Sequence, residues 1–146
     1  MDILIISGSR HLNSIKLVDE AIQASGFKFD IVIQGGAGGI DTAAFQWCLQ
    51  NQVWCIDCRV EPWAWTQYGK KAGPMRNGIM GALGTMLIAI PCPQSKGTWD
   101  MVGQAKHLGL PTYVHRAALD VKGEKETNQV ALPLGKIAPP TGKKSS

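Results

Sequence analysis

Long hydrophobic runs are missing from this chain of 146 residues. No apolar run approaches the roughly 20 residues that a helix needs to cross a bilayer, so we expect no association with a membrane. The sequence around Asp2 also lacks the basic region and the cleavage site of a signal peptide. With 45% hydrophobic and 18% charged residues, the composition is that of an ordinary globular domain. These features predict a cytoplasmic protein.

Histidine and cysteine are scarce, and they do not form the clusters that metal sites and catalytic triads require. The chain has three histidines and four cysteines. Cys55 and Cys58 have C-x-x-C spacing, but no second C-x-x-C and no nearby histidine completes a tetrahedral zinc site. We therefore expect structural roles for these cysteines, and we predict neither a bound metal nor a cofactor.

An excess of one charge is also missing from most of the chain. Residues 1–114 hold 9 Lys and Arg against 8 Asp and Glu, whereas residues 115–146 hold 6 against 3. A protein that binds nucleic acid concentrates cations on its folded surface, so we do not expect a nucleic-acid partner. The basic stretch is rich in Lys, Gly, Pro and Ser. We predict a folded domain over 1–118 and a basic C-terminal tail over 119–146.

Strand-like and helix-like segments alternate along the predicted domain. Short apolar runs predict strands, and apolar positions three or four residues apart predict helices. The strands are expected at 3–6, 29–34, 53–58, 84–90 and 111–114, the helices at about 14–26, 40–51, 74–82 and 98–108, and an irregular connection at 59–72. This order predicts a Rossmann-like three-layer α/β/α sandwich with a mainly parallel sheet of about five strands.

Three loops of small residues follow three of these strands. In a parallel sheet such loops converge on one edge, where ligands bind. Glycine turns let an anion approach the backbone, and the following helix supplies free N–H groups. The alternative is that each loop is only a tight corner. The candidate phosphate-binding residues are Gly8, Ser9 and Arg10 in the first loop, Gly35, Gly36, Ala37 and Gly39 in the second, and Ser95, Gly97 and Thr98 in the third.

Polar side chains near the predicted helix starts add to this candidate site. Lys71, Arg76 and Asn77 lie around one helix N-terminus, where they suit phosphate and ribose contacts or simply face solvent. Asp41 and Asp100 are expected in the first turns of two other helices, either to accept ribose hydroxyls or to stabilise the helix dipole.

Aromatic side chains gather in the connection at 59–72. We expect Trp63 or Tyr68 to stack on a base, the alternative being that they pin the connection to the core.

The combined motifs resemble those of the SLOG (SMF/LOG-like) superfamily, and most closely its small YspA-like, YpsA-related branch. The motifs are Gly8-Ser9-Arg10, Gly35-Gly36-Ala37-x-Gly39-x-Asp41, Lys71-Ala72-Gly73-Pro74-x-Arg76-Asn77-x-x-Met80 and Ser95-x-Gly97-Thr98-x-Asp100. The resemblance covers residues 1–115. It implies a Rossmannoid, bacterial or phage protein that binds a nucleotide or a nucleotide-derived ligand.

Two sister groups imply alternative functions. The LOG phosphoribohydrolases carry an R-K-x-x-M helix that resembles Arg76 to Met80, but Met101 stands where they have a catalytic glutamate. The DNA-processing protein A family is similar from Gly36 to Ala44, but Phe45 replaces its histidine. Three functions follow: sensing or sequestering an ADP-ribose-like or nucleoside phosphate ligand, hydrolysis with Asp100 as acid–base and Arg76 on the phosphate, and binding of single-stranded DNA.

The resemblance also implies a homodimer or a larger homo-oligomer. Five tryptophans are many for a domain of this size, and tryptophan is enriched at subunit interfaces. They are Trp47, Trp54, Trp63, Trp65 and Trp99.

Overall fold

The computed structural model describes residues 1–116 and the backbone of residues 129 and 130. It contains one six-stranded sheet in the order β3-β2-β1-β4-β5-β6. Five strands are parallel and β6 is antiparallel to β5. The strands are β1 (Ile3–Gly8), β2 (Ile31–Gln34), β3 (Cys55–Asp57), β4 (Met86–Ile90), β5 (Thr112–Val114) and β6 (Gln129–Val130). Most of the predicted tail lies outside the described residues, so the division at residue 118 stays a prediction.

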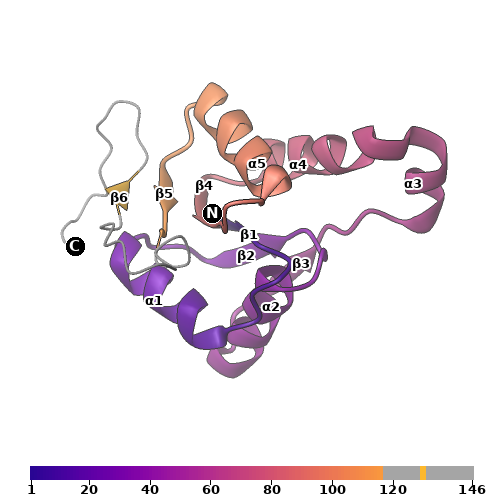
Figure 1. Ribbon diagram of the computed structural model, residues 1–146. Helices are drawn as coiled ribbons and strands as arrows, with labels where there is room; N and C mark the ends of the chain where they lie inside the picture. The colour runs from indigo at the N-terminus through magenta and orange to yellow at the C-terminus, as the bar shows by residue number, and fades with distance from the viewer. Residues whose placement is uncertain (117–128, 131–146) are drawn as a thin grey trace.

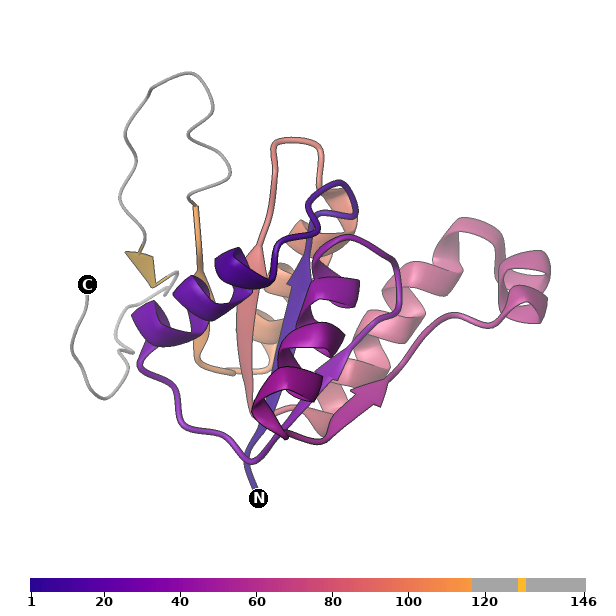
Figure 2. The ribbon, with the colours of Figure 1, turned by 90° about the horizontal axis from the view of Figure 1, so that it is seen from below.

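Helices cover both faces of the sheet (Figure 1). Helices α1 and α2 lie on one face, and α4 and α5 lie on the other (Figure 2). The helices are α1 (Ile15–Ser25), α2 (Ile40–Asn51), α3 (Pro62–Tyr68), α4 (Ala72–Leu83) and α5 (Lys96–His107), with a 3-10 turn η1 (Gly69–Lys71) between α3 and α4. This arrangement confirms the predicted α/β Rossmann-like sandwich. None of the described helices is both long and apolar enough to cross a membrane.

The period of two in each central strand divides the core into two halves. In β1, Leu4 and Ile6 pack against α1 and α2, whereas Ile5 packs against α4 and α5. In β4, Ile88 and Leu87 separate in the same way. Because both faces are buried, these strands read as continuous apolar runs.

The strand order reverses direction at the centre of the sheet, between β1 and β4. The chain moves outward from β1 to β2 and β3, and then returns to pair β4 with the other side of β1. In sheets of this kind the loops after the two diverging strands separate and leave a crevice. Here the crevice lies beyond the carboxyl ends of β1, β2 and β4, after Gly8, Gln34 and Ile90.

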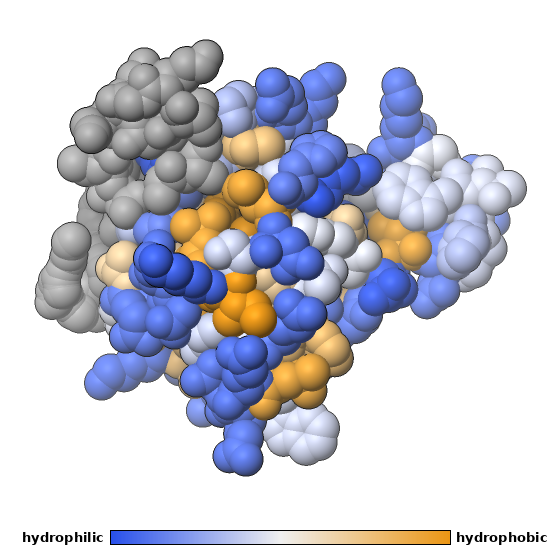
Figure 3. Space-filling view, turned by 60° about the horizontal axis from the view of Figure 1, so that its bottom comes forward, coloured by the Kyte–Doolittle hydropathy of each residue, from blue (hydrophilic) through white to orange (hydrophobic). Residues whose placement is uncertain are grey.

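The prediction of an irregular connection at 59–72 is wrong, because most of this segment is helical. Pro62 begins α3 at a position where its missing N–H is not needed, and the carbonyl of Glu61 accepts from Ala64 and Trp65. No residue of α3 is buried, so its sequence has no apolar period to reveal a helix. The helix extends away from the body (Figure 1). Its end carries mostly side chains of intermediate hydropathy, at the right of Figure 3.

Three apolar side chains in or next to the helices are exposed, although their helical spacing is that of core positions. Phe45 and Leu49 of α2 point to solvent, and Leu108 lies just beyond α5, which ends at His107. Asp100 was also placed wrongly, because α5 begins at Lys96 and Asp100 falls in its second turn. A helix start that is predicted only from the residues of the preceding loop can be displaced by one or two residues.

Candidate functional site

A cavity of about 280 Å³ lies at the central edge of the sheet. Ten of the predicted site residues line it: Gly8, Ser9, Arg10, Ala37, Asp41, Arg76, Asn77, Ser95, Gly97 and Thr98. The sequence analysis missed five further lining residues, which are Ser7, His11, Met80, Gln94 and Lys96. Lys96 had a signal, because it lies inside the third small-residue loop. The three loops and the start of α4 therefore meet around one space.

The remaining predicted residues do not line this cavity. Gly35, Gly36 and Gly39 shape the loop behind it, whereas Lys71 lies in η1 and Asp100 faces the groove between α4 and α5. Trp63 and Tyr68 contact each other on α3, with their ring centroids 6.3 Å apart. Base stacking by either ring stays a prediction.

The first two loops pack against each other through glycine. Gly39 has a φ of 56°, and a Cβ there would overlap the Ser9 carbonyl oxygen and the backbone of Arg10. The same Ser9 oxygen accepts from the N–H of Ile40 at 2.9 Å. A Cβ on Gly8 would in turn meet the Ile40 side chain at 2.6 Å. The glycines are therefore required by the close approach of the two backbones.

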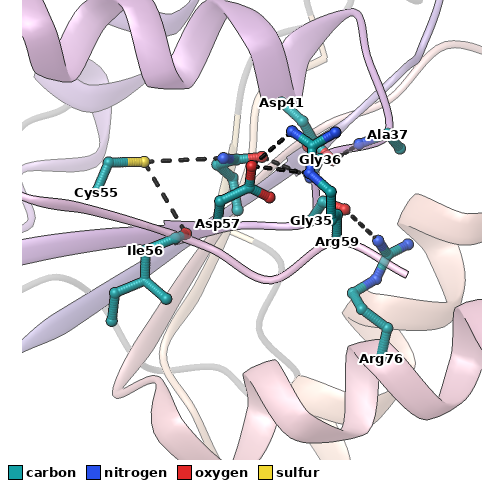
Figure 4. A network of polar contacts seen from close by, with 10 residues as sticks. Gly35, Gly36, Ala37, Asp41, Cys55, Ile56, Asp57, Arg59 and Arg76 are labelled. Atoms are coloured by element: carbon teal, nitrogen blue, oxygen red, sulfur yellow. Dashed lines mark hydrogen bonds and ion pairs between the residues drawn. The ribbon is translucent and has the colours of Figure 1, made fainter. Parts of the chain in front are cut away.

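Asp41 is a buried carboxylate at the N-terminus of α2. Its side chain is 5% exposed and lines the cavity. Oδ2 accepts from the N–H of Ala37 at 3.0 Å, as Figure 4 shows. Oδ1 has no hydrogen-bond partner among the described residues. Burial raises the pKa of Asp41 from 3.8 to about 6, and the Ala37 N–H and the nearby Arg76 charge offset only part of this rise.

This raised pKa predicts that Asp41→Asn stabilises the protein at neutral pH. The folded state binds the Asp41 proton more tightly than the unfolded state does, so this group's contribution is lost as pH rises from about 4 through 6. We expect Asp41→Asn to raise the free energy of unfolding at pH 7.5 by up to about 3 kcal/mol. The gain should vanish near pH 4, where both side chains are neutral. Urea denaturation across this pH range measures it, and an equal effect at all pH values would contradict it.

Arg76 and Asn77 connect the glycine loop to α5. Arg76 donates from Nη1 to the Gly35 carbonyl at 2.5 Å (Figure 4) and from Nε to Asn77 Oδ1 at 3.0 Å. Asn77 is 2% exposed, and its Nδ2 donates to the Gly97 carbonyl at 3.1 Å and to Asp100 Oδ2 at 2.9 Å. These contacts join the start of α4 to the glycine loop after β2 on one side and to α5 on the other.

A second network joins the first and third loops. The Sγ of Cys92 lies 3.1 Å from Ser9 Oγ and 3.3 Å from Ser95 Oγ. These two hydroxyls lower the pKa of the Cys92 thiol. Ser95 Oγ also accepts from the Cys92 N–H at 2.8 Å, and it does not cap α5.

The N-terminus of α5 consequently keeps free backbone donors beside the cavity. The first N–H groups of a helix have no partner within the helix. No side chain caps them here. The Lys96 N–H donates to the Gln94 carbonyl at 2.8 Å, which leaves the N–H groups of Gly97 and Thr98 as the donors of this first turn. All three residues line the cavity. Arg10 and Arg76 line the same space. Uncapped N–H groups with three cations around them form an environment suited to an anion.

The cysteines were expected to have structural roles and to bind no metal. In the described part of the chain the four cysteines are free, and no group of three His, Cys, Asp or Glu side chains is placed to hold a metal. Cys55 lies in β3, whereas Cys58 follows the strand.

Comparison with known proteins places the chain beside phage and bacterial proteins. No protein-family model matches it. The Gene 61 protein of Mycobacterium phage D29 is 31% identical over 84 residues, which are 56% of this chain and 67% of the phage protein. The chain belongs to the family of the Gene 61 protein. This membership agrees with the expected bacterial or phage setting.

A solved structure shares the fold of this Gene 61 family member. DNA processing protein A (DprA) from Streptococcus pneumoniae superposes with a TM-score of 0.64 at 22% sequence identity. The match covers 83% of this chain and 54% of the DprA chain, so the chain spans about half the length of that structure.

Proposed function

We propose that the cavity binds a nucleotide or a nucleotide-derived molecule, such as a nucleoside phosphate or an ADP-ribose-like ligand, and that the protein senses or sequesters it. The observation that carries this proposal is the uncapped N-terminus of α5, with Lys96, Arg10 and Arg76 around the same cavity. A phosphate placed there receives backbone N–H groups, the helix dipole and charge-assisted hydrogen bonds. Membership of the SLOG superfamily is part of this proposal, supported by the likeness to DprA.

Calorimetry with a panel of nucleoside monophosphates, NAD and ADP-ribose tests the proposal. We expect at least one of these to bind, and Arg76→Ala to weaken that binding by roughly 10- to 100-fold, because a hydrogen bond to a charged group contributes about 1.5–3 kcal/mol. Lys28→Ala is the matched control, since it removes an exposed cation from the loop before β2. No binding to any ligand of the panel, or equal binding by Arg76→Ala, would overturn the proposal.

The contacts of Asp100 support binding over N-glycosidic hydrolysis. Its Oδ2 accepts from Asn77 Nδ2 and from Gln104 Nε2, the latter at 2.8 Å. It faces a groove other than the cavity that holds the cations. A general acid must reach the bond that it protonates. Ligand recovered intact after incubation is therefore the expected result, and release of free base would favour the hydrolase instead.

DNA binding is the second candidate, and the likeness to a DNA-processing protein favours it. The near-equal charges over residues 1–114 argue against a long phosphate-binding groove. A gel shift with single-stranded DNA that weakens steeply with salt would support this candidate over the small-molecule ligand.

We also propose that the chain forms a homodimer through α4. A surface helix normally has a charged outer face, but the only charged residue of α4 is Arg76, which turns inward to Gly35. Met75, Ile79 and Leu83 are exposed at successive turns. Beside them, a groove of about 450 Å³ runs between α4 and α5.

Charge along α5 favours a second copy as the occupant of this groove. Asp100 lines one end of the groove and His107 the other, with Lys106 in the same last turn. Two copies related by a two-fold axis bring antiparallel α5 helices together, so that the acid of each meets the basic end of its partner. Of the five tryptophans, Trp47 is buried against Phe29 and its Nε1 donates to Asp19 Oδ1 at 3.0 Å, so it is not part of an interface.

Ile79→Glu is expected to produce a monomer. Ile79 is 54% exposed at the middle of α4, so a carboxylate there leaves the fold intact but is desolvated in the dimer. Light scattering at micromolar concentration should give twice 15.7 kDa for the native chain and 15.7 kDa for the variant. Leu49→Glu on α2, at the opposite face, is the control and should stay dimeric. A native chain that remains at 15.7 kDa would rule out the dimer.

A further inference from the structure

The strongest unexplained feature of the molecule is the free oxygen of Asp41. A buried carboxylate is normally paired or fully hydrogen-bonded, because desolvating the charge is costly. Asp41 is 5% exposed, and its Oδ2 accepts from the N–H of Ala37 at 3.0 Å. Its Oδ1 is buried and has no partner among the described residues, although the side chain lines the cavity.

The partner that satisfies this oxygen must be a hydrogen-bond donor without negative charge. A phosphate is repelled by the carboxylate, and it has better partners at the start of α5, where Lys96 lies. A metal ion needs several ligands, and no group of three acidic, histidine or cysteine side chains occurs in the described part of the chain. A neutral hydroxyl meets the requirement.

The position of Asp41 relative to the phosphate-binding end identifies the hydroxyl. Asp41 lies in the first turn of α2, whereas Lys96, Gly97 and Thr98 form the first turn of α5, and both turns line one cavity. A ligand that fills both ends therefore has a phosphate at one end and a hydroxyl donor at the other. A 5′-phosphorylated ribose has this composition, because its vicinal diol lies on the side of the ring away from the 5′-phosphate.

We propose that Asp41 accepts a hydrogen bond from the ribose diol of the ligand, so that the cavity selects ribonucleotides over ligands whose sugar lacks the diol. This inference rests on the proposed nucleotide function and assigns its specificity to one side chain. A site built to bind a hydroxyl rejects the analogue that lacks it, since the buried acceptor is then left unpaired. Deoxynucleotides, which carry part of the diol, should be discriminated less strongly than dideoxynucleotides.

Asp41→Asn is a sharp variant for the test. The Asn side-chain oxygen can still accept from the Ala37 N–H, while its NH₂ group turns the second position from an acceptor into a donor. The variant therefore removes the contact to the hydroxyl without emptying the space. Asp2→Asn is the matched control, because it makes the same chemical change at an exposed carboxylate beyond the opposite end of β1.

The experiment compares AMP, GMP, CMP and UMP with their 2′-deoxy and 2′,3′-dideoxy forms by calorimetry. We expect the native protein and Asp2→Asn to bind the ribonucleotide at least tenfold more tightly than the dideoxy form, and Asp41→Asn to bind the two within about twofold of each other. Equal binding of the ribo and dideoxy forms by the native protein overturns this inference and leaves the proposed function standing. Binding of none of the twelve, nor of NAD or ADP-ribose, overturns both. A preference that Asp41→Asn retains assigns the hydroxyl contact to another residue.

Discussion

Asn77→Asp is expected to be among the most destabilising single substitutions in this protein, although it exchanges an NH₂ group for an oxygen of nearly the same size. Asn77 is 2% exposed, and its Nδ2 donates to the Gly97 carbonyl and to the Asp100 carboxylate. After the exchange, a buried carboxylate faces another carboxylate and a carbonyl oxygen, with no proton between them. Breaking a buried polar pair in this way costs about 3–5 kcal/mol. Thermal unfolding should move down by roughly 10–20 °C.

A reversed pair provides the control for this prediction. Asn77→Asp combined with Asp100→Asn restores one donor and one acceptor at the 2.9 Å contact, so the double variant should be more stable than Asn77→Asp alone. The recovery should be partial, because the Gly97 carbonyl still faces an oxygen. Asn77→Asp should also regain stability below pH 4, where its carboxyl group is protonated and donates. Native-like melting of Asn77→Asp at pH 7.5 would contradict the role of Asn77 as the link between α4 and α5.

The sequence predicts the layered fold because each strand and loop has its own local sequence pattern. Buried parallel strands appear as apolar runs, and glycine-rich loops mark their carboxyl ends, so the alternation alone indicates the sheet and the convergence of the loops. Helix α3 was missed for the same physical reason, since none of its side chains is buried and no period appears. The exposure of Ile79 could not be predicted either. An apolar residue in a helix gives the same sequence pattern whether it faces the sheet or a second chain.

The details of the site depend on contacts that cross long stretches of sequence. Arg76 reaches the Gly35 carbonyl over 41 residues, and Asn77 bridges to Asp100 over 23. Neither contact follows from spacing. The sequence therefore predicts which side chains surround the cavity better than it predicts what each one binds. Asp100, expected to accept ribose hydroxyls or to act as an acid–base, is instead held by Asn77 and Gln104 outside the cavity.

Asp41 lowers the stability of the folded protein at this edge of the sheet. Burial raises its pKa to about 6, so the ionised form destabilises the folded state at neutral pH. A neutral side chain of the same shape would avoid this cost. Side chains that lower stability in this way are concentrated at functional sites. In the proposed complex a ribose hydroxyl would donate to Oδ1 and reduce this cost, so ligand binding would stabilise the folded state.

Gly39→Ala is the second substitution with a large expected effect, because two separate costs act at this position. Gly39 has a φ of 56° and a ψ of −120°, a conformation that residues with a Cβ rarely adopt. An added methyl group would also overlap the Ser9 carbonyl and the Arg10 backbone, which the hydrogen bond from the Ile40 N–H to the Ser9 carbonyl holds close to Gly39. We expect a loss of about 3–5 kcal/mol, from strained backbone together with overpacking.

Gly38→Ala separates the two costs of Gly39→Ala. Gly38 has a φ of 90°, which is also unfavourable for alanine, but its Cβ would meet nothing within 4 Å. The free energy of unfolding of Gly38→Ala should therefore fall only by the cost of the strained backbone, about 1–2 kcal/mol. Urea denaturation of the two variants measures the difference, and nucleotide calorimetry on the folded fraction shows whether the cavity survives. Equal losses would mean that the Ser9 loop yields to the methyl group, and that the two loops are not locked together. The larger loss at Gly39 would instead show that the contact between the first two loops holds the cavity in shape, because only Gly39 touches the backbone of the other loop.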